Sequence, residues 1–200
     1  MQADADYARV LEQLASARLT PFVAYDSRDS VNGLGAASTA VHVVVRVRDG
    51  KVISGTTHFK AQSDPYDASD SNPVSAPIFD PRCYHAVAES PANFEGVEAL
   101  RLTLAPVCRD AHRGDHNYPF TTIYVERETL RPLDVSGAVP PDGDSKNVAV
   151  ILDQRFGVFE GRVMPTSMRV DVSGSGLMFW LQVHVRETYS DYRFLNSPSA

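Results

Sequence analysis

The sequence lacks any run of about 18 apolar residues, the length that a helix needs to cross a bilayer. It also lacks a cluster of Lys and Arg, and its formal net charge is −6, from 19 basic and 25 acidic residues. Nucleic acids and anionic membrane surfaces attract clustered cations, so neither is an expected partner. Gly-rich phosphate loops, nucleophile elbows and dinucleotide fingerprints are absent too. The sequence therefore predicts no transmembrane segment, no cofactor and no nucleic-acid partner.

Cysteine is scarce, with Cys83 and Cys108 as the two in the sequence. Each lies beside an expected strand end, so we expect a disulfide, which would add about 3 kcal/mol of stability by closing the loop between them. Two unpaired thiols in a reducing compartment are the alternative. The first residues have neither a basic nor an apolar segment and do not read as a signal peptide. The protein is then either cytosolic or an exported protein whose leader was removed, and the expected disulfide favours a periplasmic or secreted protein.

Enough apolar residues are present for a core: hydrophobic residues make up 43% of the chain and charged residues 22%. Two hundred residues suit one large domain, so we expect residues 1–200 to form a single β domain. Helical spacing of apolar residues predicts one helix over residues 4–18, which Pro21 stops. The spaced residues are Tyr7, Val10, Leu11 and Leu14.

Beyond this helix the apolar period changes to two, which is the pattern of strands with one buried face. Asp49-Gly50 follows the first such run and predicts a hairpin. Residues 61–77 lack any period and are expected to form a long loop. We count about nine or ten strands and no repeated βα alternation, which argues against a parallel sheet. The expected fold is mainly β (α+β): a curved antiparallel sheet or unclosed β-barrel with an N-terminal helix across one face.

The last expected strand, residues 177–189, begins with both faces apolar and ends with one polar face. One short helix leaves surplus apolar surface on such a sheet, which could hold a lipid tail or be filled by side chains. The residues assigned to a ligand-binding apolar face are Val43, Val45, Leu102, Leu104, Met178, Phe179, Trp180, Leu181 and Val183.

Two metal hypotheses remain as alternatives. His112 and His116 are four residues apart with Asp110 and Asp115 close by, a spacing that places two imidazoles together on a helix. Gly114 and the flanking prolines predict a loop there, where this spacing has no fixed geometry. A thiolate zinc site is the other arrangement, although its spacing is not that of a standard zinc finger. Its residues would be Cys83, His85, Cys108 and His112.

The C-terminal half also resembles a known family through a succession of strand and turn signals over about residues 97–194. These signals lie in residues 117–133, 154–157, 161–165 and 187–194. Together they are similar to bacterial exported proteins of the LolA/LolB-like superfamily, the outer-membrane lipoprotein-sorting fold. The resemblance implies an unclosed antiparallel barrel whose concave apolar face is capped by helices and takes acyl chains. The family has several lid helices, whereas this sequence shows one.

Three functions follow as hypotheses. The first is a non-catalytic periplasmic or secreted binding module for an apolar ligand, such as a lipid or acyl chain. The second is a structural or protein-interaction domain of the cell envelope, with a filled core and an envelope protein as its partner. The third is a metal-dependent hydrolase at the loop that carries His112 and His116.

Overall fold

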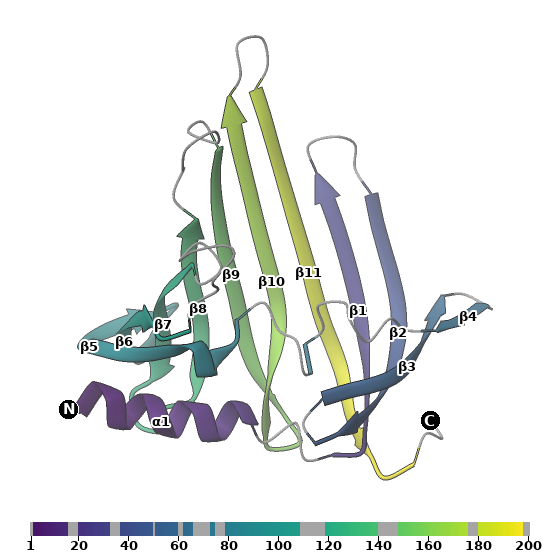
Figure 1. Ribbon diagram of the computed structural model, residues 1–200, viewed down its shortest axis with the longest axis horizontal. Coiled ribbons are helices and arrows are strands. Elements are labelled where there is room, and N and C mark those ends of the chain that lie inside the picture. Colours follow the sequence, from purple (N-terminus) through teal and green to yellow (C-terminus); the bar gives the residue numbers. More distant parts are fainter. Residues whose placement is uncertain are drawn as a thin grey trace.

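Eleven antiparallel strands form one curved sheet in the computed structural model (Figure 1). The structure describes residues 2–15, 20–32, 37–49, 51–59, 62–65, 73–74, 79–108, 119–139, 148–175 and 180–197. The strands are β1 (Phe22–Asn32), β2 (Ala37–Arg48), β3 (Lys51–Phe59), β4 (Gln62–Pro65), β5 (Tyr84–Phe94), β6 (Val97–Pro106), β7 (Phe120–Glu126), β8 (Pro132–Val139), β9 (Val148–Phe159), β10 (Arg162–Ser175) and β11 (Trp180–Leu195). Before them comes the helix α1 (Gln2–Ala15), and a 3₁₀ turn, η2 (Pro81–Cys83), precedes β5.

The order across the sheet is β4-β3-β2-β1-β11-β10-β9-β8-β7-β6-β5. Every neighbouring pair except one is consecutive in the chain, and the exception joins β1 to β11 at the middle of the sheet. The edge strands β4 and β5 do not pair with each other, so the barrel is unclosed. The expected fold class is confirmed, with a strand count just above the nine or ten expected.

Two hairpins show why the chain turns where it does. Phe94 pairs with Val97, and Phe159 pairs with Arg162, so each hairpin has a two-residue turn. Both residues of each turn have positive φ, and Gly96 and Gly161 occupy the second position. This backbone matches the right-handed twist of the flanking strands and favours glycine. The predicted Asp49-Gly50 hairpin is also confirmed, because Arg48 pairs with Lys51.

The structure differs from the expected elements at several places. Strands β1 and β5 lie in segments that were not assigned to strands, and β4 lies inside the predicted loop 61–77. β4 has no apolar alternation, and it forms by backbone pairing with β3 at the edge of the sheet. The helix begins at Gln2, two residues earlier than predicted, and its predicted last turn falls outside the described residues.

Two clusters of buried side chains fill the lower part of the concave face. One lies between α1 and strands β5 to β8, and its centre includes Val10, Leu102 and Ile123, each fully buried. The other lies on β1, β2 and β11 and includes Val23, Val45 and Tyr192. Figure 1 shows that α1 crosses the base of the sheet, whereas the long strands β9, β10, β11, β1 and β2 extend well past it.

Candidate ligand-binding face

The long strands carry two rows of aliphatic side chains on the concave face, beyond the two core clusters. Directly paired residues of an antiparallel sheet lie on the same face, so the strand register defines these rows. One row runs Val31, Val185, Val170 and Leu152, across β1, β11, β10 and β9. The next row runs Val183, Val172 and Val150. We call the six valines of these rows the valine face: Val31, Val150, Val170, Val172, Val183 and Val185.

All six side chains of the valine face are half-buried, and none of them belongs to either core cluster. Leu152 and Val41 stand at its borders, where they pack against the first and the second core cluster. The valine face therefore extends the apolar surface of the concave face along the strands, beyond the packed core.

Between the valine face and the second core cluster lies one row of polar side chains, which we call the polar step. Asp29 pairs directly with Glu187, one row below Val31 and Val185 on the same face. The hydroxyl of the buried Ser27 donates a hydrogen bond to Oε1 of Glu187 at 2.9 Å. Burial raises the pKa of Glu187, and nearby Asp29 raises it further, against hydrogen bonds from Tyr189 and Ser27. Burial also raises the pKa of Asp29.

Tyrosine rings close the second core cluster just below this polar step. Tyr25 stacks on Tyr192 with ring centroids 5.5 Å apart and meets the edge of Tyr189 at 6.1 Å. The Tyr192 hydroxyl donates to the carbonyl oxygen of Pro165 at 2.9 Å, so its polar end is satisfied inside the core. The concave face is therefore packed with side chains below the polar step.

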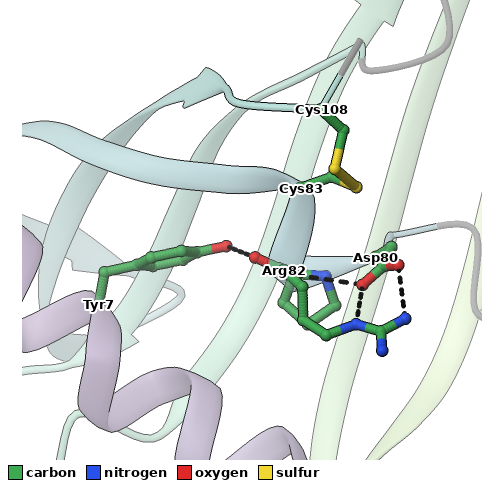
Figure 2. Close-up of polar contacts among 6 residues, drawn as sticks. Tyr7, Asp80, Arg82, Cys83 and Cys108 are labelled. Atoms are coloured by element: carbon green, nitrogen blue, oxygen red, sulfur yellow. Dashed lines mark hydrogen bonds and ion pairs between the residues drawn. A yellow bond between two sulfur atoms is a disulfide. The ribbon is translucent and has the colours of Figure 1, made fainter. Parts of the chain in front are cut away.

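The helix is fastened to the sheet through η2, as Figure 2 shows. The Tyr7 hydroxyl donates to the carbonyl oxygen of Pro81 at 2.8 Å, and burial raises the pKa of Tyr7. Asp80 caps η2 by accepting from the backbone N–H of Arg82, and it also binds the Arg82 guanidinium at 2.9 Å. This geometry fixes where α1 crosses the sheet.

The expected disulfide between Cys83 and Cys108 is present, with an S–S distance of 2.10 Å (Figure 2). It joins the end of η2 to the residues that follow β6. Backbone hydrogen bonds from Val107 and Cys108 to the carbonyl oxygen of Cys83 run beside it. The disulfide uses both sulfur atoms, so the thiolate zinc hypothesis is wrong for this structure.

At the C-terminal end of α1, a cavity of about 20 Å³ lies among the described residues Leu14, Phe79, Gln154 and Met164. That volume holds about one water molecule and no lipid chain. Where α1 meets η2, Leu11, Leu14 and Pro81 line an open groove of about 270 Å³. The packed core thus leaves the valine face and this groove as apolar surfaces on which a ligand could lie.

The predicted binding residues divide into three groups. Val43 and Val45 are buried in the second core cluster, and Leu102 and Leu104 are buried under α1 in the first. Val183 belongs to the valine face and is half-buried. Met178 and Phe179 lie outside the described residues, as do the side chains of Trp180 and Leu181. Their contact with a ligand stays a prediction.

The convex face, by contrast, carries a network of charged side chains. Arg169 contacts both Asp153 and Asp171, the latter at 3.3 Å, and Arg155 binds Glu95 at 2.6 Å. Asp134 lies among these groups with 5% of its surface exposed. Burial raises the pKa of Asp134 to about 6, and the charge of Asp153 adds to this rise while Arg155 opposes it.

The hydrolase hypothesis concerns residues that the structure does not describe, because His112, His116, Asp110 and Asp115 all lie in 109–118. Within the described ranges, no three His, Cys, Asp or Glu side chains gather closely enough to hold a metal ion. Among those same residues, no helix is both long and apolar enough to span a membrane.

The fold is similar to that of solved bacterial proteins at low sequence identity. A DUF1329 family protein from Desulfovibrio piger gives a TM-score of 0.53 at 13% identity, covering 96% of this chain and 92% of that one. A domain assigned to outer membrane lipoprotein sorting from Vibrio parahaemolyticus gives 0.52 at 12% identity, covering 96% and 93%. A LolA superfamily protein from Nitrosomonas europaea gives 0.47 at 10% identity, covering 98% and 94%.

No protein-family model matches the chain, and no curated protein matches its sequence. The similarity to the DUF1329 protein and to the Vibrio domain spans nearly the whole of each chain. The expected resemblance to the lipoprotein-sorting fold is thereby confirmed as a structural similarity.

Proposed function

We propose that the protein is a non-catalytic binding module that holds an apolar ligand, such as a lipid or acyl chain, on the valine face. The observation that carries the proposal is the set of six half-buried valines on the concave face beyond the packed core. The structural similarity to a domain assigned to lipoprotein sorting supports the same class of ligand.

The size of the valine face bounds the affinity that it can provide. Complete burial of an exposed valine side chain contributes about 1.5 kcal/mol, so covering one that is already half-buried contributes roughly 0.7 kcal/mol. The valine face then contributes about 4 kcal/mol in total, which corresponds to a millimolar Kd. A ligand bound at micromolar concentration must also contact neighbouring apolar side chains, of which Val41, Leu152 and Met168 are the nearest on this face.

The test uses an uncharged fluorescent probe, N-phenyl-1-naphthylamine, with a fluorescent fatty acid as a second ligand. A Val170→Thr/Val185→Thr variant keeps two β-branched residues but places hydroxyls where the ligand would lie. We expect its affinity to fall about tenfold, because each hydroxyl must be desolvated on binding. The matched control is Ile151→Thr, on the opposite face of β9 and 46% exposed, which should bind as the wild type does.

Two results would count against an apolar ligand on this face. One is a wild-type protein that binds neither probe and carries no lipid when examined by native mass spectrometry. The other is equal loss of affinity in the valine-face variant and the Ile151 control.

The packed core also favours a second candidate, a protein-interaction domain of the cell envelope. The cavity of about 20 Å³ at the end of α1 is the specific observation, because a space of that volume among the described residues cannot hold an acyl chain. In that case the valine face would bind an apolar segment of a partner protein. Cross-linking from a photoreactive residue at position 172 distinguishes the two, since it would capture protein in one case and lipid in the other.

For either candidate we infer that the protein works in the periplasm or outside the cell. The support is the disulfide, since disulfides persist in oxidising compartments and are rare in the cytosol. Fractionation of cells that express the natural gene, with thiol labelling of Cys83 and Cys108, tests this inference. Recovery of both cysteines as thiols in the cytosolic fraction would contradict it.

A further inference from the structure

Asp29 and Glu187 are two carboxylates in direct cross-strand pairing at the border of the valine face. Directly paired residues have Cβ atoms about 5 Å apart, and like charges at that distance destabilise a sheet. Oδ1 of Asp29 is buried and has no hydrogen-bond partner among the described residues. Glu187 accepts a hydrogen bond from the Ser27 hydroxyl at 2.9 Å.

The groups that face this pair from each packed strand are known from the register. On β1 and β11 they are Ser27, Val31, Val185 and Tyr189. On β2 they are Thr39 and Val41, and on β10 the partner of Glu187 is Met168. The adjacent Arg28 and Arg186 belong to the opposite face, because side chains alternate along a strand. Within the described part of the chain, no cationic side chain on this face pairs with either carboxylate.

We propose that Asp29 and Glu187 share a proton and thereby make ligand binding on the valine face tighter in acid. This inference rests on the proposed function, and it concerns the regulation of the same surface. An apolar ligand that covers Val31 and Val185 also removes water from the next row, which is the carboxyl pair. Desolvation disfavours the charged form of a carboxyl group.

The sign of the effect follows from linkage. Because ligand binding favours the protonated pair, the bound protein holds protons more tightly than the unbound protein does. Affinity must therefore rise as the pH falls through the range in which the unbound pair takes up a proton. The rise is about tenfold for each unit by which binding raises the pKa of the pair.

The experiment measures the Kd of N-phenyl-1-naphthylamine, which stays uncharged, at pH 5, 6, 7 and 8. The proteins are the wild type, Asp29→Asn, Glu187→Gln and the double variant. The control is Glu128→Gln, in which the altered carboxylate is exposed in the β7–β8 turn. Circular dichroism at each pH checks that each protein is folded. If the double variant does not fold, the two single variants take its place in the comparison of Kd with pH.

We expect the wild type and the Glu128 control to bind at least about tenfold more tightly at pH 5 than at pH 8. The double variant should bind at every pH as tightly as the wild type does at pH 5, since amides cannot ionise. Wild-type binding that does not change with pH overturns the inference while leaving the proposed function in place. So does a pH dependence that survives in the double variant. No binding by any of the proteins at any pH overturns the proposed function itself.

Discussion

Replacement of Asp134 by Asn should change how the stability of this protein depends on pH. Asp134 is 5% exposed on β8, and burial raises its pKa from 3.8 to about 6. The folded protein thus holds the Asp134 proton more tightly than the unfolded chain does. This contribution to stability is complete below about pH 3.8 and is lost as the pH rises toward 6.

The pKa values set the magnitude. A rise of about two pKa units corresponds to about 3 kcal/mol between the acid and neutral limits. The amide of the Asp134→Asn variant cannot ionise, so the variant should be more stable than the wild type at pH 7.5 by an amount that shrinks toward zero near pH 4. The pKa of about 6 already includes the opposing charges of Arg155 and Arg169, so the net rise sets the size of the expected effect.

Urea denaturation at half-unit steps from pH 4.5 to 7.5 measures this difference, with the free energy of unfolding taken from each curve. Comparison of wild type with variant cancels the contributions of other groups, Asp29 and Glu187 included. Glu128→Gln is the matched control and should track the wild type throughout. A stability gap between Asp134→Asn and the wild type that is the same at pH 4.5 and pH 7.5 would refute the reasoning.

Two other predictions concern the attachment of the helix and of β5. Replacing Cys83 and Cys108 together by Ser should lower the free energy of unfolding by about 3 kcal/mol, as measured in urea. Adding a reductant should then lower the urea midpoint of the wild type and leave that of the variant unchanged. Equal urea midpoints for the oxidised wild type and the variant would contradict this prediction. Tyr7→Phe removes the hydrogen bond to the carbonyl oxygen of Pro81 and should lower the free energy of unfolding by about 1 kcal/mol. Hydrogen exchange should then show faster opening of α1, and unchanged exchange there would mean that the hydroxyl does not hold the helix.

The sequence was sufficient to predict the fold class because alternation is strong where a strand has one face in the core. Val41 to Val47 alternate so regularly that β2 and its hairpin could be read directly. β1 was missed because its concave side changes from Val23 and Tyr25 to Ser27 and Asp29, which hides the period. β5 was missed because Pro91 and a bulge after Ala86 interrupt its pattern, as is common for an edge strand.

The candidate site was harder to predict than the fold. Periodicity identified which side chains of one strand share a face, and in the structure Val183 lies on the same face as its partner Val172. It could not show that Val43 and Leu102 are covered by the core while Val170 is only half-buried, because burial depends on which strands meet. The pairing of Asp29 with Glu187 needs the register of β1 on β11, and neither residue signals it locally.

The junction of β1 with β11 also constrains how the chain can assemble. Its partners lie about 160 residues apart in the sequence, whereas every other neighbouring pair of strands is linked by a local connection. Pairings of such long range form slowly because a large loop must close first. Until β11 has been synthesised, a ladder of β1 to β4 and another of β5 to β10 can form, each with an open edge at the future seam. A chain in that state is prone to pair with the wrong strand, and the docking of β11 covers both open edges at once.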